Sequence, residues 1–333
     1  MSKPKIAFYW CASCGGCEEA VVDLAEDILK VVEAVDIVFW PVAMDFKKED
    51  VERLNDGELA VSFINGAIRL KEHEEMAQLL RQKSQFIIAF GSCSHMGGIP
   101  GLGNLWNRDD IFRQVYQNAP TVHENGNGLL PQTHVPLSQG EVELPEFFDT
   151  VRTLDQTVEV DYYLPGCPPP TRLILQAIDA ILAGKLPEKG SVLAPDTALC
   201  DECDRKESKP EKLLIKDIKR VHEVMIDPEQ CFLAQGIICL GPATRSGCES
   251  LCIHANMPCT GCLGPTSRIK DFGAKAMSAI ASIIDLNDEK EAAQFIDEKI
   301  PDPVGVFYKY SLPASILRRK NMGGTNHGSK NHH

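Results

Sequence analysis

The sequence predicts an α/β protein whose parallel sheet is followed by a second, irregular region rich in cysteine. Over the first half of the chain, short apolar runs alternate with segments of helical spacing. Such alternation is typical of a parallel sheet with helices on both faces. Residues 191–270 have little periodicity and contain eight of the thirteen cysteines. A segment of this kind buries little apolar surface, so we expect metal ligation to organise it.

Five short apolar runs are predicted to form buried strands, at residues 6–10, 37–40, 59–64, 86–90 and 158–164. A first helix is predicted over 18–34, where the apolar spacing is helical and acidic residues occupy the first turn. A second helix is predicted over 71–83, and a third, over 170–183, opens with a proline and is followed by a glycine. The last predicted helix, 275–300, has apolar residues on one face and acidic residues on the other.

Composition limits both the partners and the compartment. A formal net charge of −13 argues against nucleic-acid binding, which needs a basic patch. No apolar run reaches the roughly 20 residues of a membrane-spanning helix, and the first residues do not form an export signal. We therefore expect a cytoplasmic protein that does not enter a membrane. Thiols stay reduced in the cytoplasm and thirteen is an odd number, so metal binding is favoured over disulfides.

Twelve of the cysteines sort into three sets of four. Group A consists of Cys14, Cys17, Cys93 and Cys167. Group B consists of Cys200, Cys203, Cys231 and Cys239, and group C of Cys248, Cys252, Cys259 and Cys262. Four thiolates are the ligand set of a 4Fe-4S cluster, so three such sets predict a path for electrons. Cys11 is left over, and because it forms a second C-x-x-C pair with Cys14, spacing alone does not choose between the two pairs.

The members of group A are expected to converge although they are far apart in sequence. Cys14 and Cys17 follow the first predicted strand, Cys93 follows the fourth and Cys167 the fifth. The carboxyl ends of parallel strands share one edge of an open α/β sheet, and ligands bind at that edge. The C-x-x-C pair also lies at a predicted helix N-terminus, where partial positive charge favours an anionic sulfur.

Structural zinc is the alternative ligand for each group, because four-cysteine zinc sites also use C-x-x-C pairs. Group B has the pattern C-x2-C-x27-C-x7-C, which resembles a zinc ribbon, so zinc stays open there. Group C has the pattern C-x3-C-x6-C-x2-C, which suits zinc less well. Zinc is not expected in group A, because ribbon-type sites take their cysteines from local turns rather than from distant loops.

Four stretches of the chain carry a resemblance to a known family. They are Cys14-Gly15-Gly16-Cys17-Glu18-Glu19, Gly91-Ser92-Cys93-Ser94, Pro165-Gly166-Cys167-Pro168-Pro169 and Leu199-Cys200-Asp201-Glu202-Cys203. Together they resemble the small subunit of nickel–iron hydrogenases, and the best match is the cytoplasmic methyl-viologen-reducing, deazaflavin-non-reducing type. The similarity runs in order over residues 4–320.

This resemblance implies a fold and a ligand assignment. Residues 1–188 would form a flavodoxin-like domain and residues 189–320 a cluster-rich domain, while residues 321–333 are expected to be a disordered tail. Group A would hold the proximal 4Fe-4S cluster, group C the medial one and group B the distal one. Exported family members carry histidine in place of Cys200 and often proline in place of Cys252, so the resemblance implies an all-cysteine distal site and a full four-iron medial cluster here.

The resemblance also implies a function and partners. The chain would be the non-catalytic, electron-transfer subunit of an oxidoreductase that acts on hydrogen. A large subunit would carry the nickel–iron centre, and a further iron–sulfur or flavin subunit, such as one of a heterodisulfide reductase complex, would accept the electrons. Two rivals stay open: a zinc-stabilised scaffold without a redox role, and a quinone-reductase subunit related to respiratory complex I, which would match only the first domain. An FMN-binding flavodoxin is disfavoured, because cysteines replace its phosphate-binding glycine loop.

Overall fold

The five predicted strands pair into one parallel sheet. The computed structural model describes residues 3–123, 128–285 and 288–319. The strands are β1 (Lys5–Trp10), β2 (Asp36–Phe39), β3 (Leu59–Asn65), β5 (Ser84–Phe90) and β9 (Tyr162–Leu164). Their spatial order is β2-β1-β3-β5-β9 and every pairing is parallel, which is the flavodoxin-like order 2-1-3-4-5. The predicted doubly wound α/β fold is confirmed, although β9 is shorter than the predicted run 158–164.

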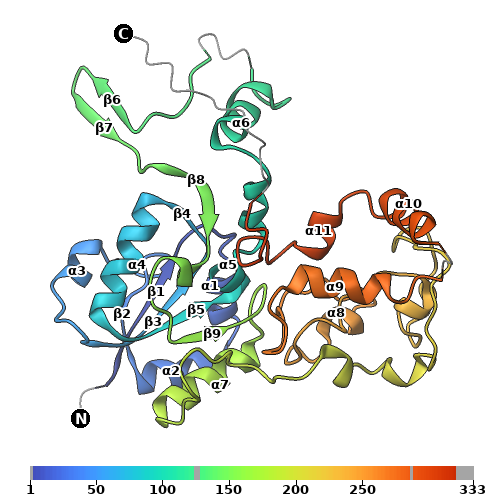
Figure 1. Ribbon diagram of the computed structural model, residues 1–333. Helices are drawn as coiled ribbons and strands as arrows, with labels where there is room; N and C mark the ends of the chain where they lie inside the picture. The colour runs from blue at the N-terminus through green and yellow to red at the C-terminus, as the bar shows by residue number, and fades with distance from the viewer. Residues whose placement is uncertain (1–2, 124–127, 286–287, 320–333) are drawn as a thin grey trace.

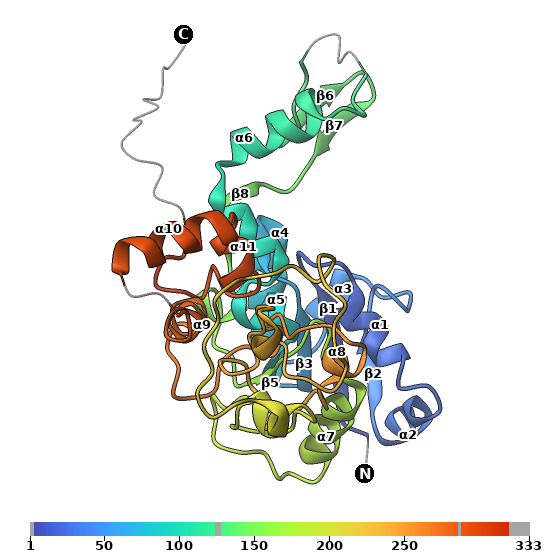
Figure 2. The same cartoon turned by 90° about the vertical axis from the view of Figure 1, so that its right-hand side faces the viewer.

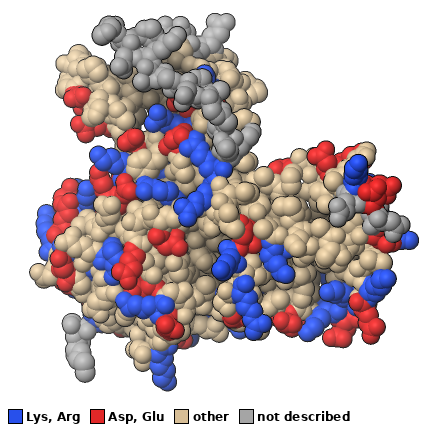
Figure 3. All heavy atoms as spheres, viewed as in Figure 1, with Lys and Arg blue, Asp and Glu red and all other residues tan. Residues whose placement is uncertain are grey.

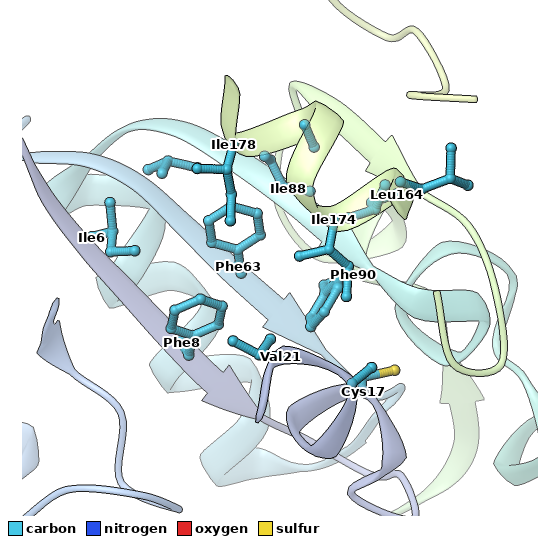
Figure 4. Packing of buried hydrophobic residues seen from close by; sticks show 14 of the residues in the cluster. Ile6, Phe8, Cys17, Val21, Phe63, Ile88, Phe90, Leu164, Ile174 and Ile178 are labelled. Carbon is cyan, nitrogen blue, oxygen red and sulfur yellow. The ribbon is translucent and has the colours of Figure 1, made fainter. Parts of the chain in front are cut away.

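Helices cover both faces of this sheet (Figure 1). One face packs against α1 (Gly16–Val22), α2 (Asp27–Ala34) and α7 (Thr171–Leu182), around a cluster that includes Phe8, Phe63 and Phe90. The opposite face packs against α3 (Lys48–Glu52) and α4 (Lys71–Lys83). Figure 4 shows the side chain of Cys17 at the margin of the first cluster. The apolar core therefore extends as far as the first cysteine loop.

Two predicted helices are each divided in the structure. The predicted helix 18–34 was wrong as a single element, because the chain turns between α1 and α2 and Ala25 has a φ of 50°, which a right-handed helix does not accommodate. The predicted helix 275–300 is divided into α9 (Phe272–Ala281) and α10 (Glu289–Lys299). Residues just after α9 instead pair with an earlier segment, where the amide of Asp285 donates to the carbonyl of Ile215.

A long excursion that the sequence pattern did not predict leaves the sheet between β5 and β9 (Figures 1 and 2). It contains α5 (Gly91–Met96), η1 (Ile99–Leu105), α6 (Arg108–Arg113), η2 (Gln114–Asn118) and η3 (Leu154–Gln156). Its strands are β6 (His134–Leu137), β7 (Gly140–Glu143) and β8 (Phe147–Arg152). The strands β6 and β7 form an antiparallel hairpin, while β8 pairs with β4 (Ile68–Leu70) and returns the chain to the body.

The region after α7 is largely irregular, as predicted. Its short elements are η4 (Leu199–Asp201), η5 (Lys206–Ser208), η6 (Leu233–Gln235), α8 (Leu251–His254) and α11 (Pro303–Phe307). The expectation that residues 191–270 bury little apolar surface was wrong, because Phe232, Leu240 and Ile253 lie in a second buried cluster. The division into domains at residues 188 and 189 stays a prediction, and the tail 321–333 lies outside the described residues.

Neither the surface charge nor the helices contradict the expectations from composition. On the face shown in Figure 3, Lys and Arg side chains are interspersed with Asp and Glu side chains over both parts of the molecule. Among the described residues, no helix combines the length and the apolar character needed to cross a bilayer.

A buried carboxylate holds the last strand of the sheet against its neighbours. The Oδ2 atom of Asp161 accepts hydrogen bonds from Arg81 Nη1 at 2.5 Å and from the amide of Ile87 at 2.8 Å. The Nζ atom of Lys189 lies 2.6 Å from Oδ1. Burial alone would raise the pKa of Asp161, but these partners outweigh burial and lower it. Because β9 leads directly into the loop with Cys167, this ion pair also positions a cysteine of group A.

We predict that Asp161→Asn lowers the free energy of unfolding by about 1–3 kcal/mol, since it leaves the buried amide of Ile87 and the side chains of Arg81 and Lys189 without a charged acceptor. A carboxylate whose pKa is lowered by folding stabilises the native state above its unfolded pKa, about 4, and this contribution is lost as pH falls through the folded pKa. The difference between the two proteins should therefore be full at pH 7 and shrink below about pH 4. Urea unfolding across this pH range measures it, with the exposed Asp45→Asn as control. Equal losses in both variants would contradict the prediction.

Candidate metal centres

The structure brings the four side chains of group A to the carboxyl edge of the sheet. Cys14 and Cys17 follow β1, Cys93 lies in α5 directly after β5, and Cys167 follows β9. Burial raises the pKa of the Cys17 thiol, and the nearby sulfurs of Cys93, Cys167 and Cys14 raise it further. Cys17 and Cys93 are buried, whereas Cys14 and Cys167 are exposed. Group A thus has an inner side within the core and an outer side at the surface.

Two glycines leave room beside the sulfurs of group A. A Cβ atom on Gly91 would lie 2.4 Å from Cys17 Sγ, and one on Gly98 would lie 2.3 Å from Cys93 Sγ. Both glycines also have positive φ angles, 84° and 57°, that L side chains rarely adopt. The backbone therefore approaches these two thiols as closely as only glycine permits.

The four cysteines of group B line one cavity, together with Arg205, Lys209 and apolar side chains. Burial raises the pKa of the Cys200 thiol to about 12, and the neighbouring sulfurs of Cys239 and Cys203 add to the effect. Burial likewise raises the pKa of Cys239 to about 11, while hydrogen bonds from the amides of Gly241 and Cys259 partly oppose it. These amides favour an anionic sulfur, which is the form that binds a metal.

Group C comes from the turn before α8, from α8 itself and from the loop that follows it. Burial raises the pKa of the Cys262 thiol to about 12, a hydrogen bond from the amide of Cys167 opposes the rise, and the sulfurs of Cys248 and Cys252 add to it. Cys259 is buried, while Cys252 is exposed on α8. Cys262 is therefore a neighbour of Cys248 and Cys252 in its own group and of Cys167 in group A, while Cys259 is a neighbour of Cys262.

Group C contacts both of the other groups. Toward group A, the amide of Cys167 donates to the sulfur of Cys262, and Ser92 Oγ donates to the carbonyl of Cys262 at 2.5 Å. Toward group B, the amide of Cys259 donates to the sulfur of Cys239. Cys248 packs against the sheet-side apolar cluster and against the second cluster. The spatial order is therefore A, C, B, although the order along the chain is A, B, C.

Within the described ranges, no three His, Cys, Asp or Glu side chains lie close enough together to hold a single metal ion. A 4Fe-4S cluster distributes its four thiolates over four irons, so its ligands do not meet around one ion. Sets of four thiols, close-approaching glycines and amide donors to sulfur together fit the donor chemistry of such a cluster.

The structure separates Cys11 from group A. Cys11 is buried in the apolar cluster on the α4 face of the sheet, whereas Cys17 packs in the cluster on the opposite face. Burial strongly raises the pKa of the Cys11 thiol, and the nearby Glu72 adds to the effect. Of the two overlapping C-x-x-C pairs, only the pair of Cys14 and Cys17 has both its thiols among the neighbours of Cys93 and Cys167.

Glu18 is a buried carboxylate that the sequence did not distinguish from Glu19. Its side chain is 3% exposed and accepts hydrogen bonds from Trp40 Nε1 and Asn65 Nδ2, whereas Glu19 is exposed. Burial raises the pKa of Glu18 to about 7, against the effect of these two donors. A signal was available, because Asn65 is a polar residue at the end of a largely apolar strand next to the cysteine loop.

Comparisons with known proteins agree with this geometry. The family model described as the 20 kDa subunit of NADH ubiquinone oxidoreductase matches residues 14–181. The chain is 40% identical over 319 residues to the iron–sulfur subunit of the F420-non-reducing hydrogenase of Archaeoglobus profundus, covering 95% of this chain and 98% of that protein. It is 38% identical over 320 residues to a subunit of the F420-non-reducing hydrogenase of Methanothermobacter thermautotrophicus, covering 96% and 97%.

A solved structure supports the fold alone. The [NiFeSe] hydrogenase of Desulfovibrio vulgaris Hildenborough matches with a TM-score of 0.50 at 16% identity, over 80% of this chain and 94% of that chain. The complex I rival would match only the first domain, whereas the hydrogenase relatives match nearly the whole chain. The chain therefore belongs to the small subunits of nickel–iron hydrogenases, the iron–sulfur subunits that transfer electrons beside a hydrogenase large subunit.

Proposed function

We propose that this subunit relays electrons from hydrogen oxidation in the large subunit through three 4Fe-4S clusters, held by groups A, C and B in that order. The observation that carries the proposal is that group C contacts both other groups through hydrogen bonds to cysteine. When bound, the clusters would supply one-electron carriers. All twelve cysteines of the three groups serve as ligands in this proposal, and none is catalytic.

The protein's own contribution is to hold the thiols and exclude water from them. Metal ligands must be deprotonated, and burial makes an uncompensated thiolate costly, so the buried thiols are suited to a cationic partner. The amides that donate to Cys239 and Cys262 stabilise negative charge on those sulfurs. Gly91 and Gly98 bring backbone close to Cys17 and Cys93, and such packing limits the access of solvent.

Groups A and B, which lie at the two ends of the spatial order A, C, B, are suited to different partners. Cys14 and Cys167 are exposed at the outer side of group A, where a large subunit can cover them. Group B lies at the other end of the series, and three of its cysteines are partly exposed. We place electron exit there, to a further iron–sulfur or flavin subunit, and propose a heterodisulfide reductase complex as that acceptor. The names of the relatives point away from F420 as the acceptor.

Three further assignments belong to the same proposal. Two apolar clusters drawn almost wholly from residues before 188 and one drawn mainly from residues after 189 support a flavodoxin-like domain over 1–188 and a cluster domain over 189–320, with Leu263 of the second domain packing into the first. The all-cysteine composition of groups B and C supports full four-iron clusters in both. The thirteen unpaired thiols support a cytoplasmic location.

Metal analysis tests the cluster assignment. The anaerobically purified subunit should contain about twelve iron and about twelve sulfide per chain if each group holds a cubane. Its dithionite-reduced form should be paramagnetic. A zinc-stabilised scaffold would instead contain about two or three zinc per chain. A colourless, zinc-containing preparation without a paramagnetic signal would refute the proposal.

Ligand substitution tests the relay in the assembled hydrogenase. Cys167→Ser removes a thiolate from group A, so we expect hydrogen-dependent viologen reduction by the complex to fall more than about tenfold, with the apolar core of residues 199–312 still folded. Cys11→Ser is the matched control, because Cys11 lies on the other face of the sheet. It should leave the iron count unchanged and the rate within about twofold. An unchanged rate in Cys167→Ser would show that the ligand assignment is wrong.

A further inference from the structure

We propose that Glu202 is a positioning residue that holds the Cys248 loop and lowers the midpoint potential of the cluster bound by group C. The inference rests on the proposed function, since it presumes a cluster in group C. Glu202 belongs by sequence to the loop of group B, between Cys200 and Cys203. By contact, however, its carboxylate belongs to group C.

Glu202 spans the gap between the two cysteine loops. Both carboxylate oxygens lie 3.0 Å from the amide nitrogen of Gly247, which donates to them. Oε1 also lies 3.8 Å from the sulfur of Cys248. The main-chain carbonyl of Glu202 accepts a hydrogen bond from Ser250 Oγ at 3.4 Å. Glu202 therefore holds the Cys248 loop by hydrogen bonds on both sides of the cysteine, at Gly247 and at Ser250.

The loop to which Glu202 is hydrogen-bonded has an unfavourable backbone conformation. Glu249 and Ser250 have φ angles of 54° and 55°, and Gly247 has a φ of 117°. Non-glycine residues rarely adopt this left-handed conformation, which persists only where the surroundings impose it. The conformation directs the amides of Ser250 and Leu251 toward the sulfur of Cys248, to which both donate. Glu202 thus maintains two donors to a ligand sulfur.

Other contacts hold the same turn, but none of them brings a charge to the sulfur. Arg172 Nε lies 3.2 Å from Glu249 Oε1 on the outer side of the turn. Thr197 Oγ1 and Ser246 Oγ lie 2.8 Å apart, and the amide of Ser246 donates to the carbonyl of Thr197 at 2.9 Å. These contacts fix the start of the loop, while Glu202 alone among them approaches Cys248.

The charge of Glu202 has no cationic side chain to offset it. Across the described part of the chain, no Lys, Arg or His forms an ion pair with its carboxylate. The nearby Arg205 instead donates to the carbonyl of Ile253 at 3.1 Å and to Asn256 Oδ1 at 2.8 Å. A negative charge 3.8 Å from a ligand sulfur disfavours addition of an electron to the group that the sulfur holds. The midpoint potential of that cluster should therefore be lower with Glu202 than without it.

Two substitutions separate the effect of the negative charge of Glu202 from the effect of its hydrogen bonds to the Cys248 loop. Glu202→Gln keeps the size of the side chain and an oxygen acceptor for Gly247, but it removes the charge. In the assembled hydrogenase, a redox titration followed by paramagnetic resonance should show a positive shift in the midpoint potential of one cluster, with wild-type iron content. Glu202→Ala also removes the acceptor, so it should give the same shift together with a changed group C signal and a loss of iron. The group C cluster is identified as the one whose signal changes in Cys252→Ala.

Glu33→Gln is the matched control, because it removes the same charge from an exposed position on α2. It should leave all three potentials unchanged. Wild-type potentials and signals in both Glu202 variants, with iron retained, would overturn the inference and leave the proposed function standing. An iron-free wild-type complex would instead refute the proposed function itself.

Discussion

The convergence of strand ends at one edge of the parallel sheet is the constraint on which the rest of this structure depends. Three loops that are distant in sequence meet there only because β1, β5 and β9 run in the same direction within one sheet. The buried ion pairs of Asp161 maintain the outermost of these strands. Without that edge, group A would not exist as a site, and group C would lose the group that it contacts at the sheet.

Hydrogen bonds between the cysteine loops place the three groups next to one another in the order A, C, B. Backbone amides of one group donate to the sulfurs of the next, from Cys167 to Cys262 and from Cys259 to Cys239. Glu202 adds a link of the same kind, since it lies in a group B loop and holds a group C loop. Such links fix the relative positions of the sites and at the same time act on the charge of the sulfurs. In the proposed relay, the same hydrogen bonds would set both the positions of the clusters and their potentials.

Much of the fold followed from sequence periodicity, and the remainder depended on contacts that periodicity does not encode. Residues 71–83 have the predicted helix with the same bounds, because its apolar spacing matches its burial. The break at Ala25 has no signature in the sequence, since alanine is a residue that ordinarily favours a helix. The excursion that carries β6 and β7 is mostly polar and showed no helical or strand pattern. For the site, spacing predicted the three groups, but the burial of Glu18 and the contacts of Glu202 required the tertiary structure.

The mismatch between chain order and spatial order has a consequence for biogenesis. The peptide emerges from the ribosome with both outer ligand sets complete by Cys239, while the middle one is still missing. Only after synthesis of Cys262 can the segment fold back between the other two and join them. If the three groups form the proposed relay, a product truncated before Cys262 would lack the group that joins its two ends. The relay would become continuous only after this last cysteine has been synthesised.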